Sequence, residues 1–152
     1  ATEGTEAVLT DLEHVVETAR EFCEDSPEAD RISYRTLDFF EADSYGEGLD
    51  AALLFSICHI FGDEKLRTVL ERTAGALRPG GYLFIRDYVL NEDGVGPPEG
   101  NFFDLHMLLA TSAGGNRSLG EYRNLLRAAG FEDVRREELP GDDDLLVARR
   151  AE

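Results

Sequence analysis

Hydrophobic positions recur along the chain in two different patterns. One is a short alternating or continuous apolar run, which is typical of the buried strands of a parallel sheet. It predicts strands at residues 5–11, 31–38, 50–56 and 82–88. The other pattern, typical of helices, places apolar residues at every third or fourth position. It predicts helices at residues 12–23, 64–78, 101–111 and 118–129.

Capping and turn residues mark where several of these elements begin or end. Ser118 and Glu121 have the spacing of a capping box, and Gly130 is expected to terminate the helix that they begin. The Pro-Gly-Gly run at residues 79–81 is expected to stop the helix before it. Residues 94–100, rich in glycine and proline, predict a loop.

Two further strand patterns lie in the last part of the chain, at residues 131–138 and 144–150. The turn signal between them, at residues 140–142, predicts an antiparallel hairpin. Alternating strands and helices followed by a hairpin predict an α/β fold, with a mostly parallel sheet covered by helices on both faces. No repeat or linker divides the sequence, so residues 1–152 are expected to form a single domain.

Acidic side chains and one histidine follow the predicted strands directly. Asp11, Asp38 and Asp87 stand at strand ends, and His59 lies just after the strand at 50–56. Ligands of such sheets bind at the carboxyl ends of the strands, so these side chains are expected to converge on one rim. A carboxylate there can accept hydrogen bonds from ribose hydroxyls. A neutral imidazole can take a proton from a phenol-like hydroxyl.

Each of these residues also has a plainer structural interpretation. An aspartate directly after a strand often caps the helix that follows, and Asp11 is placed to do so. A histidine in an apolar stretch, such as His59, is often a hydrogen-bonded core residue. The strand-end residues taken singly therefore leave both interpretations open.

The charge balance limits the classes of partner. The 152 residues include 32 acidic and 15 basic side chains, a formal net charge of -17, and Lys65 is the single lysine. Such a surface repels nucleic acid and anionic membranes, so neither is expected as a partner. An acid excess with almost no lysine favours a protein adapted to molar salt, where repulsion between carboxylates is screened. We expect such a protein to lose stability in dilute buffer.

The cysteines and the absence of targeting patterns favour a cytoplasmic protein. Cys23 and Cys58 have neither metal-ligand nor redox spacing, and are expected to be reduced, small hydrophobic residues. No metal site is expected. The N-terminal residues lack the basic and apolar regions of a signal peptide, and no apolar run is long enough to span a membrane. A dehydrogenase is disfavoured because no G-x-G-x-x-G motif is present.

Five segments, taken in order, carry a resemblance to a known family. They are DLEHVVETA (11–19), LDFFEAD (37–43), SICHIFGDE (56–64), LRPGGYLFIRDYVL (77–90) and, most specific, FFDLHMLLATSAGGNRSLGEYRNLLRAAGF (102–131). From residue 8 to residue 147, the chain resembles the S-adenosylmethionine-dependent O-methyltransferases that include the hydroxyindole and caffeate enzymes. The resemblance implies a Rossmann-like class I methyltransferase sheet with a C-terminal antiparallel hairpin.

The resemblance implies S-adenosyl-L-methionine as cofactor and S-adenosyl-L-homocysteine as its product. By position, the cofactor-binding residues are Asp11, Leu12, Asp38, Phe39, Ser56 and Phe61. Asp11 would hold the ribose, whereas Asp38 and Phe39 would hold the adenine. Ser56 falls at a polar cofactor contact, and Phe61 could stack on the adenine.

The resemblance also implies the catalytic roles. His59 would be the general base that deprotonates the acceptor hydroxyl, and Asp87 would orient the histidine. Asn116 would flank the base, in place of a glutamate that several plant relatives have there. The acceptor implied by the resemblance is a small aromatic molecule, which would contact Phe103, Met107 and Leu108.

The largest departure from the family is the absence of its first strand, its Gly-rich turn and its N-terminal dimerisation domain. Without that central strand, two strands of the sheet are expected to have unpaired edges. We therefore expect a fragment of a longer protein, although the sheet could instead close up or borrow a strand from another copy. Relatives dimerise through the missing domain, so a homodimer is implied only by the resemblance.

Smaller departures leave two other functions open. Leu37 replaces a glycine, and Ile60 with Phe61 replaces a frequent Asp-Trp pair. One alternative is a C- or N-methyltransferase of the same fold, which would not need a base at His59. The other is a degenerate, non-catalytic methyltransferase-like module, which the absent glycine loop and Asn116 would favour.

Overall fold

The computed structural model describes residues 4–141 and 143–152. The chain divides into two units, Ala1–Tyr45 and Gly46–Glu152, which are described separately. The helices and strands predicted from the sequence are present, and most of their ends lie within a few residues of the predicted ones. The structure is therefore α/β, as predicted.

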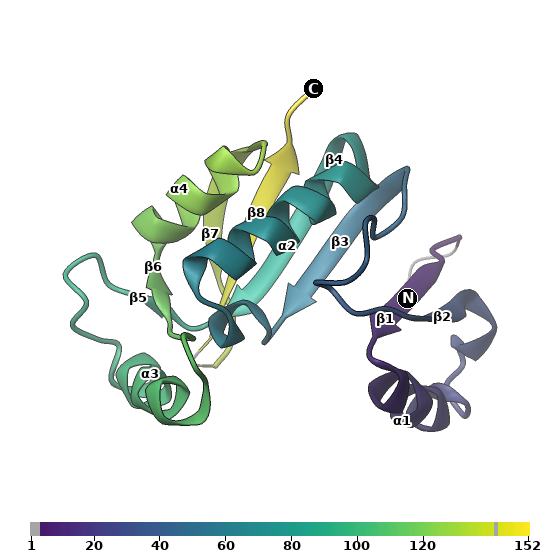
Figure 1. Ribbon diagram of the computed structural model, residues 1–152, viewed down its shortest axis with the longest axis horizontal. Helices are drawn as coiled ribbons and strands as arrows, with labels where there is room; N and C mark the ends of the chain where they lie inside the picture. The colour runs from purple at the N-terminus through teal and green to yellow at the C-terminus, as the bar shows by residue number, and fades with distance from the viewer. Residues whose placement is uncertain (1–3, 142) are drawn as a thin grey trace. The chain divides into compact units, whose positions relative to one another are not determined.

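The first unit is a strand–helix–strand motif (Figure 1). Its elements in order are β1 (Ala7–Asp11), α1 (Glu13–Cys23), the 3-10 turn η1 (Ala29–Arg31) and β2 (Ile32–Thr36). The two strands are parallel and pair in continuous register. α1 packs on them through the buried Val16, and the Arg20 guanidinium lies 4.6 Å from the centre of the Tyr34 ring. This motif places the carboxyl end of β1 directly before α1.

The second unit holds the larger sheet and the remaining elements. These are β3 (Leu49–Phe55), η2 (Cys58–Ile60), α2 (Asp63–Ala76), β4 (Leu77–Asp87), β5 (Val89–Leu90), α3 (Pro98–Ala110), β6 (Arg117–Ser118), α4 (Leu119–Ala128), β7 (Phe131–Glu138) and β8 (Asp144–Arg150). The sheet has the order β3-β4-β8-β7. β3 and β4 are parallel, whereas β8 is antiparallel to both β4 and β7, so the predicted hairpin is confirmed. A short parallel pair, β5 with β6, is separate from this sheet.

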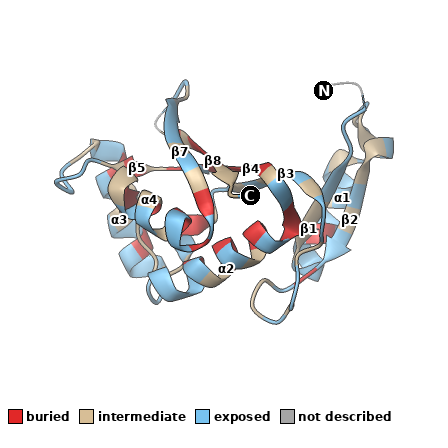
Figure 2. Cartoon of the chain, turned by 90° about the horizontal axis from the view of Figure 1, so that it is seen from above, coloured by how far each residue is buried: buried red, intermediate tan, exposed pale blue. Residues whose placement is uncertain are grey.

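Two helices, α2 and α4, cover one face of the four-stranded sheet (Figure 1). Their buried residues, coloured red in Figure 2, form the core together with buried residues of the strands. The core includes Leu66, Leu70, Leu83, Ile85, Tyr122, Leu126 and Leu146. The opposite face exposes large apolar side chains, Leu53, Phe55 and Tyr82. Within this unit, the predicted helices on both faces are therefore found on one face only.

Each unit also has a strand edge without a partner. Among the described strands, β1 pairs only with β2, and β3 pairs only with β4. These are the two edges that the sequence predicts for a sheet without the family's first strand. Unpaired backbone groups along such edges are costly unless something else satisfies them.

The Pro-Gly-Gly run at 79–81 does not act as a simple helix stop. α2 ends earlier, at Ala76, and the run forms an irregularity inside β4, where the pairing with β3 shifts register. A side-chain carbon on Gly81 would lie 3.1 Å from the carbonyl oxygen of Asp50 and 2.9 Å from that of Arg78. The glycine is needed because two backbone segments approach closely there.

The other predicted caps are present, with one shifted start. Ser118 and Glu121 form both bonds of a capping box at the start of α4, and Gly130 after its end has a φ of 91°. α3 begins at Pro98, inside the predicted loop, because a proline suits the first turn of a helix, where its missing N–H is not needed.

Candidate active site

The candidate site is centred on a buried pair, His59 and Asp87. His59 lies in η2, just past the end of β3, and Asp87 is the last residue of β4. Because these strands are parallel neighbours, their carboxyl ends meet at the same edge of the sheet. His59 Nδ1 lies 2.6 Å from Asp87 Oδ1, and the two residues are 6% and 3% exposed. The structure thus brings together the two residues for which the sequence predicts the base and its orienting acid.

Asp87 is held through both of its carboxylate oxygens. The Tyr122 hydroxyl donates to Oδ2 at 2.9 Å, and the Tyr88 backbone N–H donates to Oδ1 at 3.0 Å. When His59 donates its Nδ1–H to this carboxylate, Nε2 carries the free lone pair. No hydrogen bond from a described residue reaches Nε2. The pair can therefore present a proton acceptor while its orientation is fixed from behind.

Two more titratable side chains lie beside this pair, and both stay neutral. Burial raises the pKa of the Cys58 thiol far above its usual value, and the nearby negative charge of Asp87 raises it further. Burial likewise raises the pKa of the Tyr122 hydroxyl well above 10.0. A thiol held neutral is a poor nucleophile, so the chemistry here does not involve Cys58 as an attacking group.

α3 supplies aromatic surface next to the base. The Phe103 ring meets the His59 ring edge-on, with centroids 4.7 Å apart, and the Tyr88 ring lies at the same centroid distance from Phe103. Met107, one turn further along, is buried. Leu108 is 70% exposed and lies with other exposed apolar residues of the same helix. Of the three residues predicted to contact the methyl acceptor, Phe103 is the one that makes a ring contact with His59.

Asn116 is turned toward α3. Its backbone N–H donates to Asp104 Oδ1 at 2.6 Å, and its side-chain Nδ2 donates to the Gly100 carbonyl at 2.7 Å. No hydrogen bond joins it to His59 among the described residues. Its Oδ1 is buried and has no hydrogen-bond partner there. A buried acceptor without a donor is unusual in proteins, and it could accept a hydrogen bond from a ligand.

Arg117, which the sequence analysis did not single out, ties the histidine turn to the segment after α3. Its side chain is buried and donates to the carbonyls of Cys58, Gly115 and Phe61, at 3.3, 3.2 and 2.6 Å. It also pairs with the exposed Asp63 at 2.8 Å. One guanidinium therefore binds the carbonyls of Cys58 and Phe61, on either side of His59 in the chain.

Gly114 and Gly115 allow the backbone after α3 to approach the turn that carries His59. The Gly115 N–H donates to the His59 carbonyl at 2.9 Å. A side-chain carbon on Gly114 would lie within 3.0 Å of the His59 and Ile60 carbonyl oxygens, so only glycine fits at this approach. The sequence signal for this arrangement was the Gly-Gly-x-Arg-Ser run itself, but the sequence does not show what the run contacts.

In the first unit, the predicted cofactor residues leave carboxylate oxygens available. Asp11 Oδ1 accepts from the Leu12 backbone N–H at 2.7 Å, and α1 begins without a side-chain cap. The alternative interpretation of Asp11, as the cap of this helix, is therefore not supported. Asp38 Oδ1 accepts from the Phe40 N–H at 2.8 Å, and the Phe39 ring lies edge-on to Tyr45. In each aspartate, Oδ2 has no hydrogen bond from the described residues.

Ser56 and Phe61 flank the histidine turn on either side. Ser56 follows β3 with a φ of 54°, in the left-handed region that a serine rarely adopts. Such strained positions cluster at functional sites when the surrounding structure holds them, and here the Ser56 N–H donates to the Arg86 carbonyl at 2.9 Å. Phe61 packs against the core as a partly buried side chain. Stacking of Phe61 on an adenine remains a prediction.

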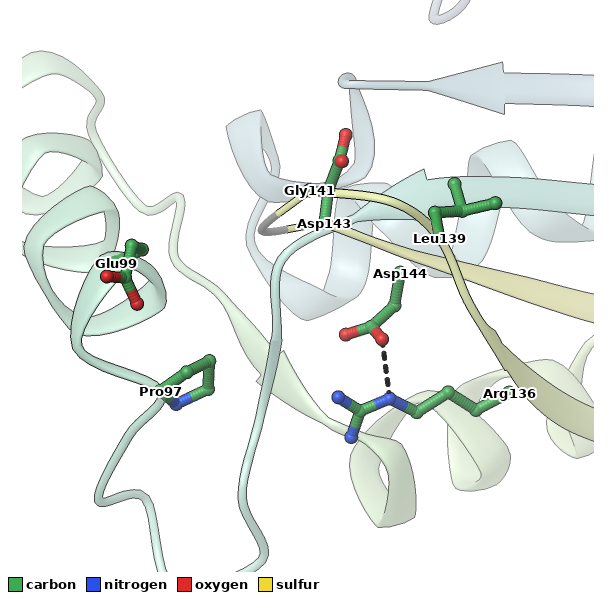
Figure 3. Close-up of a pocket in the computed structure, with 7 residues that line it drawn as sticks. All are labelled: Pro97, Glu99, Arg136, Leu139, Gly141, Asp143 and Asp144. Carbon is green, nitrogen blue, oxygen red and sulfur yellow. Dashed lines mark hydrogen bonds and ion pairs between the residues drawn. The ribbon is translucent and has the colours of Figure 1, made fainter.

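Two cavities lie elsewhere in the second unit. One, of about 250 Å³, lies beside the β7–β8 turn and is shown in Figure 3, where Arg136 is paired with Asp144. The other, of about 450 Å³, lies between β5 and the start of α4. His59 lines neither. The His59–Asp87 pair therefore locates the candidate site, which neither of these cavities includes.

The described part of the chain lacks both a metal-binding cluster and a membrane-spanning helix. No group of three or more His, Cys, Asp or Glu side chains is close enough together to hold a metal ion. No helix there combines the length and the apolar character that crossing a lipid bilayer requires.

Comparison with known proteins places this geometry in a family. The O-methyltransferase domain matches residues 3–132, which is most of the chain. The chain belongs to the O-methyltransferase domain family. The match also spans the boundary between the two units, so both carry family sequence.

Curated relatives and solved structures agree with this assignment. Acetylserotonin O-methyltransferase of Bos taurus is 36% identical over 97% of this chain and 41% of its own length. 3-Amino-4-hydroxybenzoate 4-O-methyltransferase of Streptomyces cremeus is 33% identical over 93% of this chain and 38% of its own. Human N-acetylserotonin methyltransferase in complex with SAM is similar with a TM-score of 0.85 and 28% identity, over 98% of this chain and 41% of that one. This O-methyltransferase chain thus spans well under half the length of these relatives.

Proposed function

We propose that the protein transfers a methyl group from S-adenosyl-L-methionine to a hydroxyl of a small aromatic acceptor, with His59 as general base. The observation that carries this proposal is the buried His59–Asp87 pair, in which Nδ1 and Oδ1 are 2.6 Å apart. It lies at the carboxyl ends of β3 and β4, in a chain of the O-methyltransferase family. Relatives named for O-methylation of an aromatic hydroxyl support the acceptor class.

The chain's own contribution is to hold and move one proton. Asp87 fixes the imidazole with Nε2 as the basic nitrogen, and it stabilises the imidazolium that forms when Nε2 takes the hydroxyl proton. The cofactor supplies an electrophilic methyl group attached to sulfur. The acceptor oxygen must be aligned with that methyl, so correct orientation of the acceptor supplies much of the rate enhancement.

The acceptor would lie against Phe103 and within reach of Nε2 of His59. The edge-on contact of Phe103 with the imidazole places a flat apolar surface beside the base, which suits a planar acceptor. Met107 would support this surface from behind. We propose that Asn116 contacts the methyl acceptor through its unpartnered Oδ1 and does not act directly on His59. Leu108, being exposed, would contact the acceptor only if another part of the protein covered it.

The predicted cofactor-binding residues of the first unit offer hydrogen-bond acceptors that suit the hydroxyl and amino donors of an adenosine group. Asp11 and Asp38 each keep one carboxylate oxygen free for ribose hydroxyls or the adenine amino group. Leu12 and Phe39 add apolar surface beside these acids. In the second unit, Ser56, in its left-handed conformation, and Phe61 stay proposed cofactor contacts on the resemblance alone.

Replacing His59 tests the base directly. We expect His59→Ala to lower the rate of methyl transfer by about 100- to 10,000-fold, because a positioned base contributes on that order. Binding of S-adenosyl-L-homocysteine should change little. The matched control is His14→Ala, since His14 is exposed on α1 and has no proposed role. Turnover of His59→Ala close to that of the control would remove His59 as the base.

We also propose the setting in which the protein works. The family match across residues 3–132 supports one catalytic domain that includes both units. The net charge of -17 supports function in molar salt, and the free Cys23 and Cys58 suit a reducing cytoplasm. A small-molecule acceptor is the proposed partner. A homodimer is proposed only from the resemblance.

A further inference from the structure

Tyr122 is the largest fully buried side chain among the described residues, and its hydroxyl has a specific partner. The residue lies on α4 with 0% exposure, inside the hydrophobic core. Its hydroxyl donates to Asp87 Oδ2 at 2.9 Å. A phenylalanine would fill nearly the same core volume, so the packing of this position does not require the hydroxyl. The hydroxyl therefore acts on Asp87.

We infer that Tyr122 is a positioning residue that sets the proton affinity of His59 through Asp87. The three side chains form one line of hydrogen bonds, from the Tyr122 hydroxyl through both oxygens of Asp87 to His59 Nδ1. The inference rests on the proposed role of His59 as the general base. It adds a residue on a different element, α4, to the site built from β3, β4 and η2.

Two physical effects follow from this line. First, a carboxylate held at both oxygens cannot rotate, so the imidazole that it binds keeps its plane and the direction of Nε2. Second, a hydrogen bond to a carboxylate draws off part of its negative charge, which weakens its stabilisation of a neighbouring imidazolium. Removal of the Tyr122 hydroxyl should therefore strengthen the stabilisation that Asp87 gives to an imidazolium at His59.

The other titratable or charged groups around this line do not replace the hydroxyl. Cys58 lies on η2 next to His59, and Arg117 on β6 donates to the Cys58 carbonyl. His106, on α3, faces Phe103 and not Asp87. α2 contributes apolar residues, such as Leu66 and Leu70, to the core around Tyr122. All of these groups remain in place when the hydroxyl alone is removed.

The test is a histidine NMR titration of the chain and of Tyr122→Phe in molar potassium chloride. The chain has only three histidines, so the imidazole signals of His59 can be assigned with a His59→Gln variant. We expect Tyr122→Phe to move the His59 titration midpoint upward by about half a pH unit or more, which corresponds to about a threefold change in proton affinity. Tyr82→Phe, on the exposed sheet face, is the matched control and should leave the midpoint unchanged.

An unchanged or lowered midpoint in a folded Tyr122→Phe variant would overturn the inference. If that variant does not fold, the same coupling can be read from the unaltered sequence labelled with 3-fluorotyrosine. The fluorine signal of Tyr122, the most buried of the five tyrosines, should then inflect at the His59 midpoint and lose that inflection in His59→Gln. A signal that ignores the His59 titration would overturn the inference.

This test needs no turnover, so it is independent of the proposed function. A coupled His59 in a protein that methylates normally as His59→Ala would refute the base and leave the hydrogen-bond line intact. In an active protein, the acid limb of the kcat/KM profile should shift upward with the NMR midpoint in Tyr122→Phe. A purely structural role of Tyr122 would lower the rate at every pH without moving that limb.

Discussion

Asp11 stands at the end of β1, and one of its carboxylate oxygens accepts no hydrogen bond from the described residues. The family to which the chain belongs uses S-adenosyl-L-methionine. The other oxygen of Asp11 is bound to the backbone of Leu12, which fixes the direction of the side chain. The structure removes the helix cap as an explanation of this residue, because α1 starts without one. What remains is a fixed acceptor of the kind that binds the hydroxyls of a ribose.

Removal of that acceptor should weaken cofactor binding. We expect Asp11→Ala to raise the Kd for S-adenosyl-L-homocysteine about tenfold or more, because a buried hydroxyl pair would lose its acceptor. Titration calorimetry in molar potassium chloride measures this. Asp25→Ala, at an exposed position of the same unit, is the control for the lost charge. Equal affinities in the two variants would mean that Asp11 does not contact the cofactor.

Single residues also show where a sequence stops being informative. His59 and Asp87 could be predicted, because each directly follows a strand and parallel strands end at one edge. Tyr122 and Arg117 could not, because their partners lie 35 and up to 59 positions away in the sequence. Neither residue follows one of the strands that the sequence predicts. Only the structure shows that Tyr122 on α4 contacts the end of β4 and that Arg117 on β6 contacts η2.

At the scale of elements, η2 is the part of the site with the least regular structure of its own. It is a single 3-10 turn, and its position depends on the neighbouring segment at 114–117. Arg117 reaches three carbonyls there because the guanidinium has five donors in a rigid fork. Strand and helix patterns predicted the larger elements well, whereas this turn and β5–β6 were too short to leave a periodic signal.

A lysine should not replace the arginine at this position. Arg117→Lys keeps the charge, but a single ammonium nitrogen lacks the fork of donors that reaches the carbonyls of Cys58, Gly115 and Phe61. We expect the free energy of unfolding to fall by about 2 kcal/mol or more, given the cost of unsatisfied buried groups. Urea denaturation measures the difference. Arg127→Lys, exposed near the end of α4, is the matched control. A similar small effect in both variants would mean that the Arg117 hydrogen bonds do not stabilise the turn that carries His59.

At the scale of the whole molecule, the acidic composition and the open edges set the conditions for folding. The sequence predicted the α/β class and the free edges of β1 and β3, because the order of strand patterns is legible without side-chain contacts. It also predicted helices on both faces, and in the second unit the helices cover only one. The sequence pattern shows that a strand is apolar on a face but does not show what covers that face.

The net charge of -17 predicts a strong dependence on salt. The Debye length falls from about 10 Å at 0.1 M to about 3 Å at 1 M, so repulsion among surface carboxylates is largely screened in molar salt. We expect the Tm to rise steadily between about 0.1 M and about 2 M potassium chloride, because the Debye length shortens over this range. Sucrose at equal osmolality should raise it less, since sucrose does not screen charge. Equal effects of the two solutes would contradict adaptation to salt.

The central claim is that this chain's site methylates oxygen. The most direct test supplies S-adenosyl-L-methionine with a deuterated methyl group, together with an aromatic acceptor that carries adjacent hydroxyl and amino groups, and locates the label by mass spectrometry and NMR. The account predicts the labelled methyl on the hydroxyl oxygen alone, and its loss in His59→Ala. Label on nitrogen or on a ring carbon, or no label from a protein that binds the cofactor, would contradict it.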